Sequence, residues 1–220
     1  MDRFRTSTRR PAEPVPLTDG DGTGSGGTLV GVRTIDGVVL VSDTRTRRDS
    51  VVCSEGVRKI ARIHPTAAMG STDDLGGARS VLRTIRSAVD LYEKRRGEPM
   101  DATALTGAVA AKLRSRSAPA GPFVLGCVDH EGPHVFTLER DGGVLEDEYA
   151  AVGSGRGSVY GSIDAEAPES PSMVEARRIA GRAVEGASER DGWTGEGVQV
   201  AEITADGVDI ERHDSVDELL

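Results

Sequence analysis

The sequence predicts an α+β sandwich in which two antiparallel sheets are stacked between layers of helices. Two observations support this fold class. The expected elements follow the order strands, two helices, strands, helix, strands, and Gly-containing turns join consecutive strands. A third observation, the length of 220 residues, suits one good-sized domain and hardly two.

The first half of the chain begins with two strands within residues 28–43, joined by a hairpin turn at Asp36-Gly37. Residues 50–63 predict a second, short strand pair around Glu55-Gly56. Apolar positions at helical spacing then predict a helix over 74–95, closed by Gly97 after a basic last turn. Asp101 is expected to cap a second helix that runs to about residue 114.

The second half returns to strands at residues 122–129, 134–139 and 143–153. A third helix is expected to begin at Ser172, where Ser172 and Glu175 have the spacing of a capping box, and to run to about residue 189. The segments 197–204 and 207–213 predict a last hairpin. Residues 1–26 are rich in Pro, Gly and polar residues, and we expect them to form a leader or tail outside the folded domain.

The composition excludes several classes of partner. The chain has 27 Lys+Arg against 36 Asp+Glu, a net charge of −9, which argues against binding nucleic acid or an anionic membrane. No apolar run approaches the roughly 20 residues that span a bilayer, and the N-terminus lacks the apolar core of a secretory signal. We therefore expect a soluble, cytoplasmic protein. The acidic, lysine-poor composition favours a halophilic source, although a high-GC genome would enrich the same residues.

Neither the cysteines nor the histidines predict a metal centre. Cys53 and Cys127 lie in separate apolar runs, so both are expected to be buried thiols. His130 and His134 flank a predicted turn at Gly132-Pro133, which favours a solvated turn over a metal pair. No metal or organic cofactor is expected.

Four features could carry chemistry, and each also has a plain structural explanation. The segment GSGGTLVGV is either a linker that meets a strand or a cleavage junction that exposes an N-terminal nucleophile. Lys59 could be an ordinary surface lysine, but it stands in a chain that otherwise uses Arg almost throughout, which favours a compact ammonium at that position. Asp43 ends the second strand, where it could simply cap a turn. The segments 153–155 and 191–195 are Gly-containing loops.

Together these features resemble a proteasome β-type subunit of archaeal, haloarchaeal-like type over residues 27–213. The resemblance is carried by TLVGVRTIDGVVLVSDTR, KIARIHP, LYEKRRGEPM, GCVDHEGPHVFTLERDGGVLEDEYAAVGSG, VYG and ASERDGWTGEGVQVAEITADGVDI. It implies the N-terminal-nucleophile (Ntn) hydrolase αββα sandwich, followed by a C-terminal tail at 214–220. It also implies stacked seven-membered rings with α-type and other β-type subunits, which enclose a proteolytic chamber.

In that family a threonine at the mature N-terminus attacks the peptide carbonyl through its hydroxyl, and its own α-amine can act as the base. The resemblance implies that Lys59 lowers the pKa of the nucleophile and that Asp43 positions Lys59. The supporting loop groups would be Ser154, Asp191 and Thr194, the last at a position where the family usually has serine.

The sequence departs from the family at three positions. Gapless counting from Lys59 places the nucleophile position on Gly27, which has no hydroxyl, and strand alternation turns Thr28 to the opposite face. Asp73 falls on the oxyanion-hole glycine, where its charge would oppose the oxyanion by roughly 4 kcal/mol at 4 Å and an effective dielectric near 20. Arg47 replaces a small residue beside the substrate strand. These departures predict a ring-building or regulatory subunit with lost or weak activity.

Two alternatives stay open at this point. The chain could be an active threonine-type endopeptidase that removes residues 1–27, uses Thr28 as its nucleophile and cuts protein or peptide substrates. It could also be a peptide or amide hydrolase of the wider Ntn class that works outside any proteasome.

Overall fold

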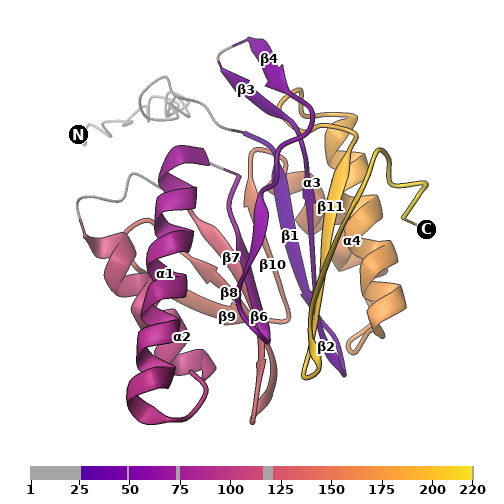
Figure 1. Ribbon diagram of the computed structural model, residues 1–220. Helices are drawn as coiled ribbons and strands as arrows, with labels where there is room; N and C mark the ends of the chain where they lie inside the picture. The colour runs from indigo at the N-terminus through magenta and orange to yellow at the C-terminus, as the bar shows by residue number, and fades with distance from the viewer. Residues whose placement is uncertain (1–25, 49, 73–74, 116–120, 220) are drawn as a thin grey trace, which may run out of the picture.

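The computed structural model describes residues 26–48, 50–72, 75–115 and 121–219. Two five-stranded antiparallel sheets face each other, and two helices cover the outer face of each sheet, so that the molecule has four layers in the order α–β–β–α (Figure 1). The predicted sandwich is confirmed. A short hairpin of β3 (Thr46–Arg48) and β4 (Val51–Ser54) extends beyond the end of the sheets.

The first sheet contains β1, the first strand of the described residues. Its outer face is covered by α3 (Arg156–Glu166) and α4 (Met173–Ser188), which bury a cluster of Val, Ile and Ala side chains against it. In spatial order its strands are β10 (Tyr149–Gly153), β1 (Thr28–Arg33), β2 (Gly37–Asp43), β11 (Val198–Thr204) and β12 (Gly207–His213).

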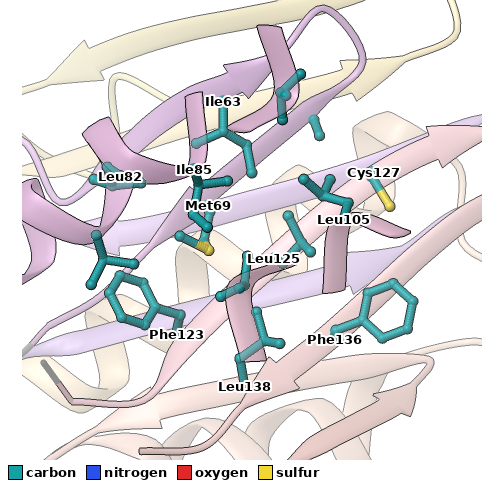
Figure 2. Packing of buried hydrophobic residues seen from close by; sticks show 14 of the residues in the cluster. Ile63, Met69, Leu82, Ile85, Leu105, Phe123, Leu125, Cys127, Phe136 and Leu138 are labelled. Carbon is teal, nitrogen blue, oxygen red and sulfur yellow. The ribbon is translucent and has the colours of Figure 1, made fainter. Parts of the chain in front are cut away.

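The second sheet is covered by α1 (Leu75–Arg96) and α2 (Ala102–Arg114). Figure 2 shows the core between them, where Phe123, Met69 and Leu125 of the sheet pack with Ile85 and Leu105 of the helices. In spatial order the strands of this sheet are β5 (Ile60–His64), β6 (Ala67–Gly70), β7 (Phe123–Asp129), β8 (Gly132–Leu138) and β9 (Val144–Asp147).

A third buried cluster fills the space between the two sheets, and glycines let the sheets approach closely. A Cβ added at Gly31 would lie 2.8 Å from side-chain carbons of both Leu40 and Val124. A Cβ at Gly126 would lie 2.7 Å from Val38. Larger residues at these two positions would therefore separate the sheets or force neighbouring side chains out of their rotamers.

The predicted helix ends are confirmed. Gly97 follows α1 with a φ of 74°, a left-handed conformation that glycine adopts without strain. The Asp101 side chain accepts a hydrogen bond from the Ala104 N–H, and Ser172 and Glu175 form the expected reciprocal capping box at the start of α4.

Two predictions about the strands were wrong. The expected pair around Glu55-Gly56 does not form, because β4 pairs back onto β3 whereas β5 pairs forward onto β6. Residues 55–59 instead connect the hairpin to the second sheet, with the Val57 N–H donating to the carbonyl of Thr44. The predicted strand over 143–153 is two strands, β9 and β10, which belong to different sheets.

The helix α3 was not predicted, and one of the two cysteines is not buried as predicted. Gly157 and Gly161 weaken the helical signal of α3, whose stability comes from burying Val159 and Ile163. Cys127 is buried as expected, but Cys53 is exposed because the β3–β4 hairpin that carries it projects from the domain.

The segment that follows β12 packs back onto the helix layer of the first sheet. Val216 and Leu219, beyond β12, are buried against the cluster under α4, where Gly181 leaves room for the Leu219 side chain.

Within the described ranges, no helix is long and apolar enough to cross a membrane.

His134 connects the β7–β8 hairpin to the neighbouring strand. Its Nε2 lies 3.2 Å from Asp129 and its Nδ1 lies 2.6 Å from Glu146. Burial disfavours the imidazolium, but the hydrogen bonds and charges of the two carboxylates outweigh burial and raise the pKa of His134 above its ordinary value of 6.5. Asp129 also accepts the backbone N–H of Ala102, so this ion pair is linked to the start of α2.

A raised pKa in the folded state means that protonated His134 stabilises the fold fully below pH 6.5 and loses this contribution as the pH rises through the raised pKa. We expect His134→Gln to destabilise the protein at pH 6 and to cost progressively less towards pH 9, measured by urea unfolding. His130→Gln, at an exposed position of the same hairpin, is the control. A destabilisation by His134→Gln that does not change with pH would contradict this assignment.

Candidate functional site

The candidate site lies where β1 begins, beside the end of β2. Antiparallel pairing places Thr28 opposite Gly153 at the end of β10, and Asp43 opposite Val198 at the start of β11. The loops that follow β10 and precede β11 therefore meet at the first residues of the described domain. This register brings together groups that are more than 100 residues apart in the sequence.

A buried ion pair forms the centre of this site. Lys59 Nζ lies 2.6 Å from Asp43 Oδ1, and both side chains are almost completely inaccessible to solvent. Asp43 also accepts three backbone N–H groups: Thr28 donates to Oδ1, whereas Arg45 and Gly195 donate to Oδ2. Each carboxylate oxygen thus accepts two hydrogen bonds, as a buried charge requires.

The position of Lys59 is set by a residue that the sequence analysis did not identify. The buried amide of Gln199 on β11 accepts the backbone N–H groups of Lys59 and Ile60 through Oε1 and donates to the Ile60 carbonyl. Burial lowers the pKa of Lys59 from its ordinary value, while the charge and hydrogen bond of Asp43 act in the opposite direction. The available signal for Gln199 was a single polar residue in the otherwise apolar start of a strand.

Gly27 lies directly against this ion pair. Its φ of 127° is a conformation that residues with a side chain rarely adopt. A Cβ at this position would lie 2.2 Å from Lys59 Nζ and 2.5 Å from Asp43 Oδ1. A side chain at position 27 would therefore need the ends of the Lys59 and Asp43 side chains to shift and the backbone of residue 27 to change its conformation.

A second network holds the backbone of Gly27 from the other side. Its N–H donates to Ser154 Oγ over 3.0 Å, and Ser154 donates to Asp191 Oδ2 over 2.5 Å. The Thr194 hydroxyl donates to the same Asp191 oxygen over 2.7 Å. The structure therefore places Ser154, Asp191 and Thr194 together, in one connected group around the first residues of β1.

Thr28 points into this second network and not toward Lys59. Its Oγ1 lies 2.8 Å from Thr194 Oγ1, and the residue is fully buried. Because Thr194 uses its one hydroxyl proton on Asp191, Thr28 must be the donor to Thr194. Gly155 makes this arrangement possible, since a Cβ there would lie 2.1 Å from Thr28 Oγ1. The Thr28 hydroxyl is thus held by the Thr194 hydroxyl.

Arg47 lies beside the site, on β3. Its guanidinium carbon is 5.2 Å from the centre of the Trp193 ring, and its Nη atoms donate to the carbonyls of Gly192 and Ser50. Trp193 in turn packs against Gly26, a contact that the sequence analysis did not predict. Asp73, the third position that departs from the family pattern, lies outside the described residues.

The chemistry of the site follows from these contacts. In the described part of the chain, no group of three or more His, Cys, Asp or Glu side chains is arranged to hold a metal ion. The polar groups bind the backbone of residues 26–28: Lys59 donates to the Gly26 carbonyl over 3.4 Å, Ser154 accepts the N–H of Gly27, and Asp43 accepts the N–H of Thr28. The site thus holds a segment of its own chain, and among the described residues the Lys59 ammonium donates to Asp43 and to the Gly26 carbonyl.

A sandwich of this kind, with a Lys–Asp pair and a Ser–Asp–Thr network at the start of its first strand, has the architecture of the Ntn hydrolases. A family model described as "Proteasome subunit" matches residues 23–203. The chain is 44% identical to "Proteasome subunit beta" of Halorhabdus utahensis, an alignment that covers 100% of this chain and 96% of the relative. It is 42% identical to "Proteasome subunit beta 2" of Haloterrigena turkmenica, over 89% of this chain and 83% of that protein. It is 39% identical to "Proteasome subunit beta" of Haloferax volcanii, an alignment that covers 100% of this chain and 88% of that protein. This chain belongs to the proteasome subunit family.

The ion pair at the centre of the site should matter for stability whether or not the chain is an enzyme. We expect Lys59→Met to lower the free energy of unfolding by about 3–5 kcal/mol, because it leaves the Asp43 charge buried without its partner. The measurement is denaturant unfolding of the full chain.

Lys94→Met on the exposed side of α1 is the matched control and should change the free energy of unfolding by less than about 1 kcal/mol. The double variant Asp43→Asn/Lys59→Met should cost less than the sum of the two single substitutions. Unchanged stability of Lys59→Met would show that the lysine is not buried beside Asp43.

Proposed function

We propose that this chain is a β-type subunit of the proteasome core particle that takes part in building the ring and does not cut peptide bonds itself. In this proposal it assembles with α-type and other β-type subunits in stacked seven-membered rings, in the cytoplasm, and lowers or retunes the proteolysis carried out by active neighbours. The observation that carries the proposal is Gly27, which stands at the nucleophile position against Lys59 and Asp43.

The contacts at position 27 support a lost nucleophile more strongly than the missing hydroxyl alone does. A nucleophile at this position would need its side chain where Lys59 Nζ and Asp43 Oδ1 now lie. The nitrogen of Gly27 is a peptide N–H that donates to Ser154, beside the loop after β10. In an active subunit, the free α-amine of the nucleophile would lie at this nitrogen. In this proposal Asp43, Lys59, Ser154, Asp191 and Thr194 retain a structural role without catalysis.

Arg47 supports the same conclusion from the substrate side. The family resemblance places a small residue here, next to the strand along which substrate would lie. The Arg47 side chain fills that space and is fixed by two carbonyls and the Trp193 ring. A substrate peptide would have to displace an ordered guanidinium before it reached position 27.

One observation favours a second candidate, an active threonine-type endopeptidase that uses Thr28. The Thr28 nitrogen lies 2.8 Å from the Asp43 oxygen that Lys59 also contacts, so cleavage before Thr28 would create an amine inside a charged site. Against this candidate, the Thr28 hydroxyl is buried and donates to Thr194. It would have to rotate out of that pocket, or the strand would have to shift its register, before it could attack a carbonyl.

The two candidates differ in the mature N-terminus. We expect the intact mass of the chain, in particles purified from the native high-salt source, to include Gly27 and residues before it. We also expect Thr28→Ala to leave this mass unchanged except for the substitution, because Thr28 is not the residue that would cleave the leader. Thr84→Ala on the exposed face of α1 is the control. A mass that begins at Thr28, together with a block of leader removal in Thr28→Ala, would establish the endopeptidase instead.

The positions that depart from the family can be restored directly. We expect Gly27→Thr combined with Asp73→Gly to gain hydrolysis of a fluorogenic peptide in assembled particles whose other β-type subunits are inactive. Removing the Asp73 charge restores an oxyanion-hole donor, which is worth about 10²–10³-fold in rate, so the double variant should exceed Gly27→Thr alone by roughly that factor. Gly186→Ala, where α4 has open space, is the control. No gain in an assembled double variant would contradict the placement of the nucleophile on Gly27.

A further inference from the structure

The link between Gly26 and Gly27 is enclosed on both sides. A Cβ at Gly26 would lie 2.5 Å from Trp193 Cβ and 2.6 Å from Trp193 Cγ, so the tryptophan packs directly against the Gly26 backbone. On the other side, the Gly27 position is closed by Lys59 and Asp43. Both glycines are buried, although the chain continues from them into the N-terminal leader.

The polar groups of this link are also bound. Lys59 donates to the carbonyl of Gly26, and Ser154 accepts the N–H of Gly27 while its hydroxyl lies 3.3 Å from the Gly27 carbonyl. The next N–H, that of Thr28, donates to Asp43. A peptidase needs an extended backbone with free N–H and C=O groups, and here both kinds of group already have partners inside the protein.

Trp193 is itself held in place by Arg47. The guanidinium lies over the indole ring at 5.2 Å, a distance at which cation–π attraction is significant. It also donates to the carbonyl of Gly192, the residue before Trp193, over 2.5 Å and to the carbonyl of Ser50 over 2.8 Å. One side chain therefore fixes both the ring and the backbone of the loop that covers Gly26, and ties that loop to the β3–β4 hairpin.

We propose that Arg47 and Trp193 form a latch over the Gly26–Gly27 link that shields it from cleavage, so that the leader stays attached to the assembled subunit. This inference rests on the proposed function, in which the site holds its own chain and cuts nothing. The latch also accounts for glycine at residue 26, because a side chain there would push against the indole of Trp193.

The single tryptophan of the chain makes the latch measurable, because intrinsic tryptophan fluorescence then reports on Trp193 alone. In the full-length chain, we expect Arg47→Ala to increase acrylamide quenching of this fluorescence by about twofold or more. Arg48→Ala, at the exposed next residue of the same strand, should leave the quenching unchanged. Equal quenching in the two variants would contradict the role of Arg47.

Shielding is tested by proteolysis of the same full-length proteins with proteinase K, followed by intact mass. In the wild type, products should retain Gly26, whereas products that begin at residue 27 or later should form at least tenfold faster in Trp193→Ala. Cleavage of this kind tracks the population in which the link is open. Trp193→Phe, which keeps a ring over Gly26, should behave nearly as the wild type does, and unfolding midpoints measured alongside separate latch opening from loss of fold.

The outcomes separate the latch from the proposed function. If the chain purified from its source begins at Thr28 and Thr28→Ala blocks leader removal, the proposed function is wrong. If it begins at Thr28 and Thr28→Ala does not block leader removal, the latch is wrong and the proposed function stands. If the leader is retained but Trp193→Ala and wild type lose Gly26 at the same rate, with equal unfolding midpoints, the latch is wrong and the proposed function stands.

Discussion

The arrangement of the site depends on the buried Asp43–Lys59 ion pair. Asp43 is the last residue of β2, and its carboxylate accepts backbone N–H groups from the start of β1, from Arg45 in the segment after β2 and from the loop before β11. Lys59 adds the segment that enters the second sheet. The Asp43 carboxylate thus connects three segments of the first sheet with one another and, through Lys59, with the segment that enters the second sheet. It can be buried because the Lys59 ammonium neutralises its charge.

The ion pair also determines what position 27 can be. With Lys59 Nζ only 2.6 Å from Asp43, the space beside them is filled, and the chain passes through it as a glycine with positive φ. Thr28 then begins β1 with its side chain on the other face, in the pocket formed by Thr194 and Gly155. The order Gly27-Thr28 therefore decides which face carries the hydroxyl, and it places that hydroxyl away from the ammonium.

Much of this could be predicted from the sequence, because it depends on local rules. Strand alternation places Gly27 and Thr28 on opposite faces, and capping residues mark the ends of α1, α2 and α4. The helix α3 could not be found in this way, since its two interior glycines oppose helix formation and its stability comes from packing of Val159 and Ile163.

Contacts between distant loops were equally hidden. Trp193 lies against Gly26 and Gln199 supports Lys59 only because the sheet register brings those segments together. No pattern within either segment encodes the contact. The pairing of residues 50–63 was misjudged for a related reason: the segment around Glu55-Gly56 has the composition of a turn but serves as a crossing between the hairpin and the second sheet.

The persistence of catalytic-type residues around Gly27 has a physical explanation that does not require catalysis. Removing Lys59 would leave a buried carboxylate without its counter-charge. Removing Asp43 would leave a buried ammonium without its counter-charge and three backbone N–H groups without their acceptor. Either single step is costly, even though replacing the whole cluster by apolar groups could be neutral. A nucleophile has no such protection, because replacing a threonine side chain by the hydrogen atom of glycine leaves no buried charge behind. Under the proposed function, the nucleophile position can therefore change by a single residue replacement, while Asp43, Lys59 and their partners remain fixed by the structure they support.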